Sequence, residues 1–170
     1  KITITIQEPR RFDVPEGVMG RARRQKVGAA LYDEMSGMIF ETCNRHQTLF
    51  SSLLEARDIF GKRAEAVEDI ERAPLSYDRL VLGSFVLGKV LKKRCATGAP
   101  VGVLLPNSNA AVVTFFALQA AKRVPALLNF SAGSKNMISA CQTARIQQVL
   151  TSRRFVEMAK LQDAVDQLAE

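Results

Sequence analysis

The sequence holds one histidine, and its neighbours decide whether it could perform acid–base chemistry. An imidazole becomes an effective general base when a carboxylate orients it. An aspartate five residues further on would supply that carboxylate, but the fifth residue after His46 is Ser51. We therefore predict that His46 is an exposed side chain in a polar segment, without a catalytic role.

Other residues that could do chemistry are also badly spaced for it. Gly61-Lys62-Arg63 lacks both the upstream glycine and the hydroxyl residue of a phosphate-binding loop, and Gly98 and Gly102 do not have the spacing of a dinucleotide-binding loop. A group of carboxylates falls in a loop-like stretch, where a solvated charge run is the expected interpretation. It comprises Glu65, Glu68, Asp69 and Glu71.

The three cysteines, Cys43, Cys95 and Cys141, are far apart and form no C-x-x-C pair. With a single histidine in the chain, they predict no metal site. Isolated thiols are typical of a reducing compartment, so we expect the protein in the cytosol or on the cytosolic face of a membrane. The chain is thus predicted to contain no catalytic, cofactor-binding or metal-binding residue.

Four cations crowd the start of a helix predicted over residues 19–41. They are Arg21, Arg23, Arg24 and Lys26. A helix N-terminus already carries partial positive charge, so cations are unfavourable there. Apolar residues follow at helical spacing, namely Val27, Leu31, Met35 and Met38. Two interpretations stay open, contact of this amphipathic helix with an anionic membrane and a solvated linker helix.

The net charge of +7 is unevenly distributed, since no acidic residue lies between Asp78 and Glu157. A basic field attracts phosphates, anionic lipid or an acidic protein. The alternative is that acids elsewhere in a longer protein balance this stretch.

The chain has 170 residues, of which 47% are hydrophobic and 24% charged, as in globular proteins. The most apolar region, residues 101–130, is broken by Pro106 and by polar residues, so no membrane-spanning helix is expected. The sequence starts at Lys1 and stops at Glu170 within a helical pattern. We expect both ends to be cuts within a longer chain.

Hydrophobic patterning predicts an α/β protein. Residues 1–7 alternate as in a half-buried strand, and residues 42–48 form a polar break. Next come a short helix from Leu49, a short strand over 66–69, and a helix with Ser76 as its N-cap. Apolar strands at 101–105, 124–128 and 146–150 then alternate with helices at 110–121, 136–144 and from Arg153 onward. This βαβαβα order predicts a parallel sheet covered on both faces.

Three landmarks in this order resemble the opening of the adenylate-forming (AMP-binding) ligase superfamily. They are Leu75-Ser76-Tyr77, the segment VGVLLPNS at 101–108, and VPALLN at 124–129. The resemblance implies that residues 49–170 begin an adenylating domain. Pro106, Asn107 and Asn129 then serve as strand ends and turns, with a structural role.

A closer resemblance extends upstream, through the segments LYDEMSGMIF at 31–40, AVVTFFALQA at 111–120 and LNFSAG at 128–133. These segments look like the bacterial family of bifunctional acyl-[acyl carrier protein] synthetase/2-acylglycerophosphoethanolamine acyltransferases. The resemblance implies that residues 1–7 are the tail of an acyltransferase domain and residues 8–48 a linker.

For the parent enzyme, this resemblance implies fatty-acid activation with ATP and Mg²⁺, loading of acyl carrier protein, and reacylation of lysophospholipid. It places the enzyme on the cytoplasmic face of the bacterial inner membrane, with an anionic membrane surface and no nucleic acid among its partners. The family's phosphate loop would lie beyond Glu170 and its acyltransferase histidine before Lys1, so we expect this chain alone to be inactive. Two alternatives stay open, another AMP-forming ligase such as an acyl-CoA synthetase, and a non-catalytic α/β module that binds an acidic partner.

Overall fold

The computed structural model describes residues 4–9, 11, 16–44 and 46–169. The chain forms two compact units, Lys1–Gln47 and Thr48–Glu170. None of the helices in these described ranges is both long and apolar enough to cross a bilayer.

The first unit contains one long helix, α1 (Gly20–Thr42), which confirms the helix predicted over residues 19–41. None of the α1 residues is buried, and no acidic residue lies in its first turn. The segment Thr5–Glu8 lines a cavity with Leu31 and Met35 of the helix. The Gln7 side chain also donates from Nε2 to Glu41 Oε2 at 2.6 Å.

The strand predicted over residues 1–7 is wrong for the residues that the structure describes. Residues 4–9 form no strand, and Ile4 and Ile6 are exposed. Residues 1–3 lie outside the described ranges. Alternating apolar residues form a strand only when a neighbouring strand accepts their backbone hydrogen bonds, and the described part of the first unit contains no such partner.

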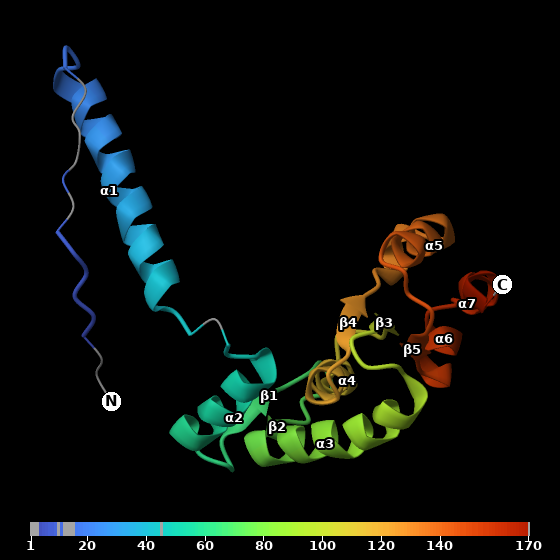
Figure 1. The fold of residues 1–170 in the computed structure, drawn as a ribbon. Coiled ribbons are helices and arrows are strands. Elements are labelled where there is room, and N and C mark those ends of the chain that lie inside the picture. The colour runs from blue at the N-terminus through green and yellow to red at the C-terminus, as the bar shows by residue number, and fades with distance from the viewer. Residues whose placement is uncertain (1–3, 10, 12–15, 45, 170) are drawn as a thin grey trace. The chain divides into compact units, whose positions relative to one another are not determined.

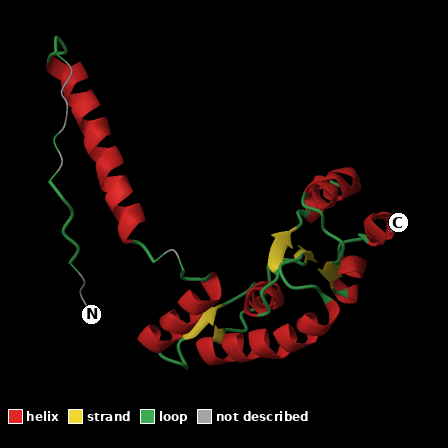
Figure 2. Cartoon of the chain, in the orientation of Figure 1, coloured by secondary structure: helices red, strands yellow, loops and turns green. Residues whose placement is uncertain are grey.

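The second unit contains a three-stranded sheet, a two-stranded sheet and the remaining helices (Figures 1 and 2). Its elements are α2 (Leu49–Phe60), β1 (Glu65–Val67), β2 (Leu75–Ser76), α3 (Tyr77–Arg94), β3 (Pro100–Leu104), α4 (Asn109–Ala120), β4 (Val124–Leu127), the 3₁₀ turn η1 (Phe130–Ala132), α5 (Ser134–Thr143), β5 (Val149–Thr151), α6 (Arg153–Met158) and α7 (Gln162–Ala169).

Side-chain caps set the starts of four helices in this unit, α2, α3, α4 and α6, the last through Ser152, which accepts from Phe155 N at 3.1 Å. Thr48 and Ser51 form a reciprocal capping box at α2. The Ser76 side chain accepts from Arg79 N at the start of α3, which confirms the predicted N-cap. Ser108 accepts from Ala111 N in the same way at α4. These local bonds satisfy backbone N–H groups that have no partner within the helix.

The larger sheet is parallel, as the sequence predicts, and its strand order is β4-β3-β5. Val101 and Val103 of β3 pack with α3 and α4, while Leu104 packs with α5, α6 and α7. Helices therefore cover both faces of the central strand. This explains why β3 is a continuous apolar run, buried from Val101 to Leu104.

The last third of the chain departs from the prediction at two places. Ile146 N–H donates to Cys141 O at 2.8 Å and closes the end of α5, so β5 begins only at Val149. The single helix predicted from Arg153 onward is two helices, α6 and α7. The break occurs where Lys160 has φ 52°. It allows Phe155 of α6 and Ala164 of α7 to pack in the same core cluster.

Candidate functional site

The direction of the chain after β3 and after β4 creates a crevice between these two strands. β3 leads into α4 on one face of the sheet, whereas β4 leads into α5 on the other face (Figure 1). Where the connections of neighbouring parallel strands diverge in this way, ligands bind at the carboxyl ends of the strands. The fold therefore points to the ends of β3 and β4 as a site.

A cavity of about 680 Å³ lies at this point. Its lining comes from three segments, the end of β1, the end of β3 with the first turns of α4, and the end of β4 with η1. The lining residues are Val67, Glu68, Asp69, Val103, Leu105, Pro106, Asn107, Ser108, Ala111, Val112, Phe115, Leu127, Leu128, Asn129, Phe130 and Ser131.

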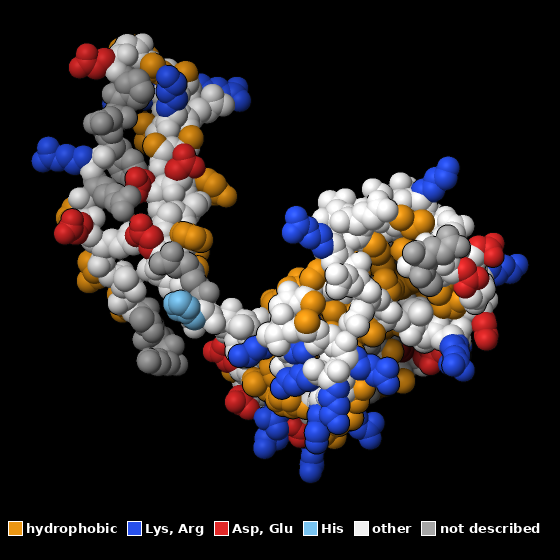
Figure 3. Space-filling model, turned by 45° about the vertical axis from the view of Figure 1, so that its right-hand side comes forward, with side chains coloured by type: hydrophobic (Ala, Val, Ile, Leu, Met, Phe, Trp, Pro, Cys, Tyr) orange, Lys and Arg blue, Asp and Glu red, His pale blue; other side chains and the backbone are white. Residues whose placement is uncertain are grey.

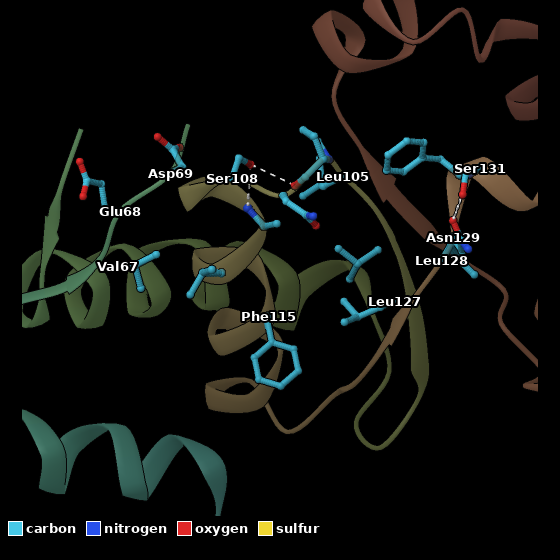
Figure 4. A pocket seen from close by; sticks show the side chains of 16 residues that line it. Val67, Glu68, Asp69, Leu105, Ser108, Phe115, Leu127, Leu128, Asn129 and Ser131 are labelled. Carbon is cyan, nitrogen blue, oxygen red and sulfur yellow. Dashed lines mark hydrogen bonds between the residues drawn. The ribbon is translucent and has the colours of Figure 1, made fainter. Parts of the chain in front are cut away.

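The cavity lining combines carboxylates with apolar side chains. In Figure 4 the carboxylates of Glu68 and Asp69 lie along the upper side of the view, and Val67, Phe115 and Leu127 lie below them. The lining includes two carboxylates but no lysine or arginine. An apolar or neutral group therefore fits the cavity better than a polyphosphate does.

The N-terminus of α4 is already occupied by an acidic side chain. Asp69 Oδ2 accepts from Asn109 N at 3.0 Å, across 40 residues of sequence. Asn109 in turn donates from Nδ2 to Ala73 O at 2.7 Å, while its Oδ1 is buried without a hydrogen-bond partner. Asp69 is thus a helix-capping residue and not part of a solvated charge run, because it lies where a carboxylate interacts favourably with the helix dipole.

Asn129 shapes the opposite rim of the cavity. Its Oδ1 accepts from Ser131 N at 3.0 Å and from Ser131 Oγ at 2.7 Å, bonds that hold the turn after β4 (Figure 4). The sequence interpretation gave Pro106, Asn107 and Asn129 a structural role at strand ends. The structure places all three there and also in the cavity lining. In the sequence, the signal that could have identified these residues as part of a site was their position directly after two predicted parallel strands.

The predicted membrane-contact residues belong to the first unit, in the first turns of α1, and do not line this cavity. Arg21, Arg23, Arg24 and Lys26 are all exposed. Successive residues turn by about 100° around a helix, so Arg24 projects on the side of the apolar stripe and Lys26 on the far side. Arg21 and Arg23 project to the two flanks of the stripe. Whether these side chains contact lipid stays a prediction.

The histidine and the cysteines add no catalytic group to the cavity. His46 is exposed, as predicted. Cys43 is exposed while Cys95 and Cys141 are buried, and burial raises the pKa of the Cys141 thiol. In the described ranges, no group of three or more His, Cys, Asp or Glu side chains could hold a metal ion.

Comparison with known proteins identifies the fold. No protein-family model matches the sequence. Among solved structures, the chain is similar to VinN (21% identity, TM-score 0.63, covering 73% of this chain and 32% of VinN). It is also similar to the inhibitor-bound N-terminal domain of FACL13 from Mycobacterium tuberculosis (18% identity, TM-score 0.58, 69% of this chain and 29% of that one).

A third similar structure is the NpsA N-terminal subdomain from Klebsiella oxytoca in complex with 3-hydroxyanthranilyl-AMSN (18% identity, TM-score 0.56, 65% of this chain and 31% of that one). The chain therefore has the α/β fold of the N-terminal subdomain of adenylate-forming ligases. It spans about a third of the length of the solved structures that it matches.

Proposed function

We propose that the chain belongs to an adenylate-forming (AMP-binding) ligase in which residues 49–170 open the adenylating domain. In its full form, the proposal is that the parent is a bifunctional acyl-[acyl carrier protein] synthetase/2-acylglycerophosphoethanolamine acyltransferase. Residues 8–48 then link the adenylating domain to an acyltransferase domain that ends at residues 1–7. The parent activates a fatty acid as acyl-adenylate, loads acyl carrier protein and reacylates a lysophospholipid.

The adenylating part of this proposal is supported by one agreement, between the sequence landmarks and the residues that line the cavity. The sequence landmarks that resemble the superfamily include the ends of β3 and β4, at 105–108 and at 127–129. Those two segments line the cavity at the point where the chain turns to opposite faces of the sheet. The landmarks and the fold are independent observations, and both support the same class of enzyme.

The chemistry of the cavity suggests which part of the reaction this chain serves. Its residues do not fit the phosphates of ATP, since the lining has no cation and Asp69 already caps α4. Among the described residues, no group of three or more His, Cys, Asp or Glu side chains is placed to hold a metal ion such as Mg²⁺. ATP would supply the adenylyl group while held, with Mg²⁺, by other residues of the parent. The apolar side chains here, among them Val103, Phe115 and Leu127, bind the acyl group and exclude water from it.

The proposal also covers partners and location. Acyl carrier protein, fatty acid and lysophospholipid are the substrates of the parent. An anionic membrane, at the cytoplasmic face of the bacterial inner membrane, is the surface that Arg21, Arg23, Arg24 and Lys26 contact. Two observations support this membrane contact. The first turn of α1 contains no acidic residue, and all four cations are exposed.

The test of the adenylating part is ATP–pyrophosphate exchange by the full-length parent. We expect exchange that depends on a long-chain fatty acid, and absence of any acid-dependent exchange would overturn the proposal. Transfer to acyl carrier protein and then to 2-acylglycerophosphoethanolamine tests the bifunctional form. Transfer to coenzyme A alone would instead assign the parent to the acyl-CoA synthetases.

A pair of substitutions on one strand tests the role of the cavity. Leu127 is exposed within the cavity lining, and Val124 is exposed on the same strand outside it. In the parent, Leu127→Asp should raise the KM for fatty acid at least tenfold, since it places a charge against the acyl group. The KM for ATP should stay unchanged, and Val124→Asp should alter neither constant. Equal effects of the two variants would contradict the assignment.

A further inference from the structure

Helix α3 has an apolar outer face that is largely exposed, although Phe85 at its flank packs edge-to-face on Phe50 of α2 with the ring centroids 5.1 Å apart. Its buried side comprises Leu80, Val81, Ser84, Gly88 and Leu91. On the opposite side of the helix, Leu82, Val86 and Val90 are 64%, 61% and 49% exposed, and Phe85 flanks them. Their spacing of four residues aligns the three aliphatic side chains along the outer surface of the helix.

The same outer face is basic. Arg79, Lys89 and Lys93 project beside the exposed apolar residues and are themselves exposed. The one acidic residue of the helix, Asp78, is paired with Arg57 of α2 at 2.6 Å. Lysine and arginine side chains, with hydrophobic ones between them, gather over the lower edge of this unit, where α3 runs (Figure 3). The face thus combines apolar area with positive charge.

The structure of the helix itself does not account for this combination. Cations at Lys92, Lys93 and Arg94 suit the negative end of the helix dipole. Arg79 lies in the first turn, where a cation is disfavoured, and Lys89 lies mid-helix. A solvated helix would carry neutral or mixed-charge residues at positions 82, 86 and 90 instead of three aliphatic side chains.

Charge and shape together select the occupant of this face. A second copy of the chain would bring two basic faces together, which like-charge repulsion opposes. The face is the outer, convex side of one helix, so it can enter a soft planar surface along its length. Interfacial helices bury aliphatic residues at the boundary of lipid headgroups and acyl chains while lysine and arginine contact phosphates.

We propose that the outer face of α3 docks the second unit onto an anionic lipid bilayer. Leu82, Val86 and Val90 enter the boundary between headgroups and acyl chains, and Arg79, Lys89 and Lys93 contact the lipid phosphates. This face shares no residue with α1 or with the cavity lining. The inference does not rest on the proposed enzymatic activity.

The test uses tryptophan fluorescence, because the chain contains no tryptophan. Val86→Trp places a single reporter on the outer face of α3, Leu82→Trp repeats it one turn away, and Ile70→Trp provides an exposed control in the loop between β1 and β2. The complete chain is mixed with vesicles of phosphatidylcholine, with and without phosphatidylglycerol. Circular dichroism confirms that the variants keep their helical content.

We expect the emission of the Val86→Trp and Leu82→Trp variants to move to shorter wavelength only with vesicles that contain phosphatidylglycerol, and brominated acyl chains to quench it. The emission of the Ile70→Trp control should not change. Unshifted emission from both α3 reporters would overturn the proposal, and sedimentation of the chain with vesicles in that case would assign binding to another segment, such as α1. A shift only on addition of purified acyl carrier protein would assign the face to an acidic protein and overturn it equally.

Charge variants provide the second arm. Combining Val86→Trp with Arg79→Gln, Lys89→Gln and Lys93→Gln should weaken partitioning onto the anionic vesicles roughly a hundredfold, about fivefold for each cation. The matched control removes three exposed cations elsewhere in the same unit, Lys135, Arg145 and Arg153. Equal weakening by both sets would show attraction by net charge alone and contradict a docking face on α3.

Discussion

The Arg123 side chain donates from Nε to the backbone oxygen of Cys95 at 3.0 Å, although 28 residues separate them. Its Nη2 donates to Lys92 O at 3.1 Å, and its Nη1 donates to Ala121 O. Arg123 is only 7% exposed. The guanidinium therefore caps carbonyls at the C-terminus of α3, where a cation also suits the helix dipole, and it connects α3 to the start of β4.

Arg123→Met should lower the free energy of unfolding by about 2–4 kcal/mol, because it leaves several buried carbonyls without a donor. The measurement is urea unfolding followed by circular dichroism. Lys122→Met is the matched control, since the neighbouring Lys122 is exposed and loses the same charge. It should change stability by less than about 0.5 kcal/mol. Equal losses in the two variants would contradict a capping role for Arg123.

Gly88→Ala should destabilise the second unit by about 1–3 kcal/mol. A Cβ at residue 88 would lie 3.0 Å from Ala117 O, a backbone atom of the neighbouring helix α4, which cannot rotate away. Gly28→Ala in α1 meets no atom within 4 Å and should instead strengthen its helix through better helix propensity. Thermal melts compare the two. An unchanged or raised melting midpoint in Gly88→Ala would show that α3 and α4 can move apart without loss of stability.

The three cysteines should differ in reactivity. Cys43 is exposed and should react quickly with a disulfide reagent in the native chain, while the buried Cys95 and Cys141 should react only on unfolding. Burial raises the pKa of Cys141, so its thiolate fraction at pH 8 is below that of an ordinary cysteine. In the native chain, labelling of Cys141 at pH 8 should therefore be slower than that of Cys43, as mass spectrometry of labelled peptides can measure. Equal labelling of all three at pH 8 would contradict this burial.

The chain alone should show no adenylating activity. It lacks the phosphate loop and lysine that stabilise the charge of the transition state, and the cavity offers no cation in their place. The measurement is ATP–pyrophosphate exchange with a long-chain fatty acid. Exchange above a no-enzyme control would show that this interpretation of the cavity is wrong.

A peptide of residues 18–42 should sediment with anionic vesicles at low salt. Changing Arg21, Arg23, Arg24 and Lys26 to Gln should abolish this binding, because anionic headgroups contribute about 1 kcal/mol per basic residue. Among the single substitutions, Lys26→Gln should weaken vesicle binding least, since Lys26 lies on the far side of the helix from the apolar stripe. Equal binding of the unaltered and fourfold variant peptides would contradict an electrostatic contact. Loss of binding in physiological salt would exclude insertion of Leu31 and Met35.

Much of the fold follows from local sequence patterns. The three apolar strands between helices predict the parallel sheet. The central strand β3 is apolar throughout because helices cover both of its faces. Ser76 and Ser108 mark helix starts because their hydroxyls accept from backbone N–H groups three residues on. These interactions span a few residues, so the order of residues determines them.

Other features depend on contacts that no local pattern encodes. Lys122, Arg145 and Lys160 have positive φ, and they end α4, α5 and α6 where glycine would be the expected residue. The alternating residues of 1–7 predict a strand, yet residues 4–9 form none in the absence of a partner. Asp69 caps a helix that begins 40 residues later. The cavity, too, exists only once the ends of β1, β3 and β4 meet. For Asp69 and for the cavity, the deciding partner is distant along the chain, so only the tertiary structure could bring the two together.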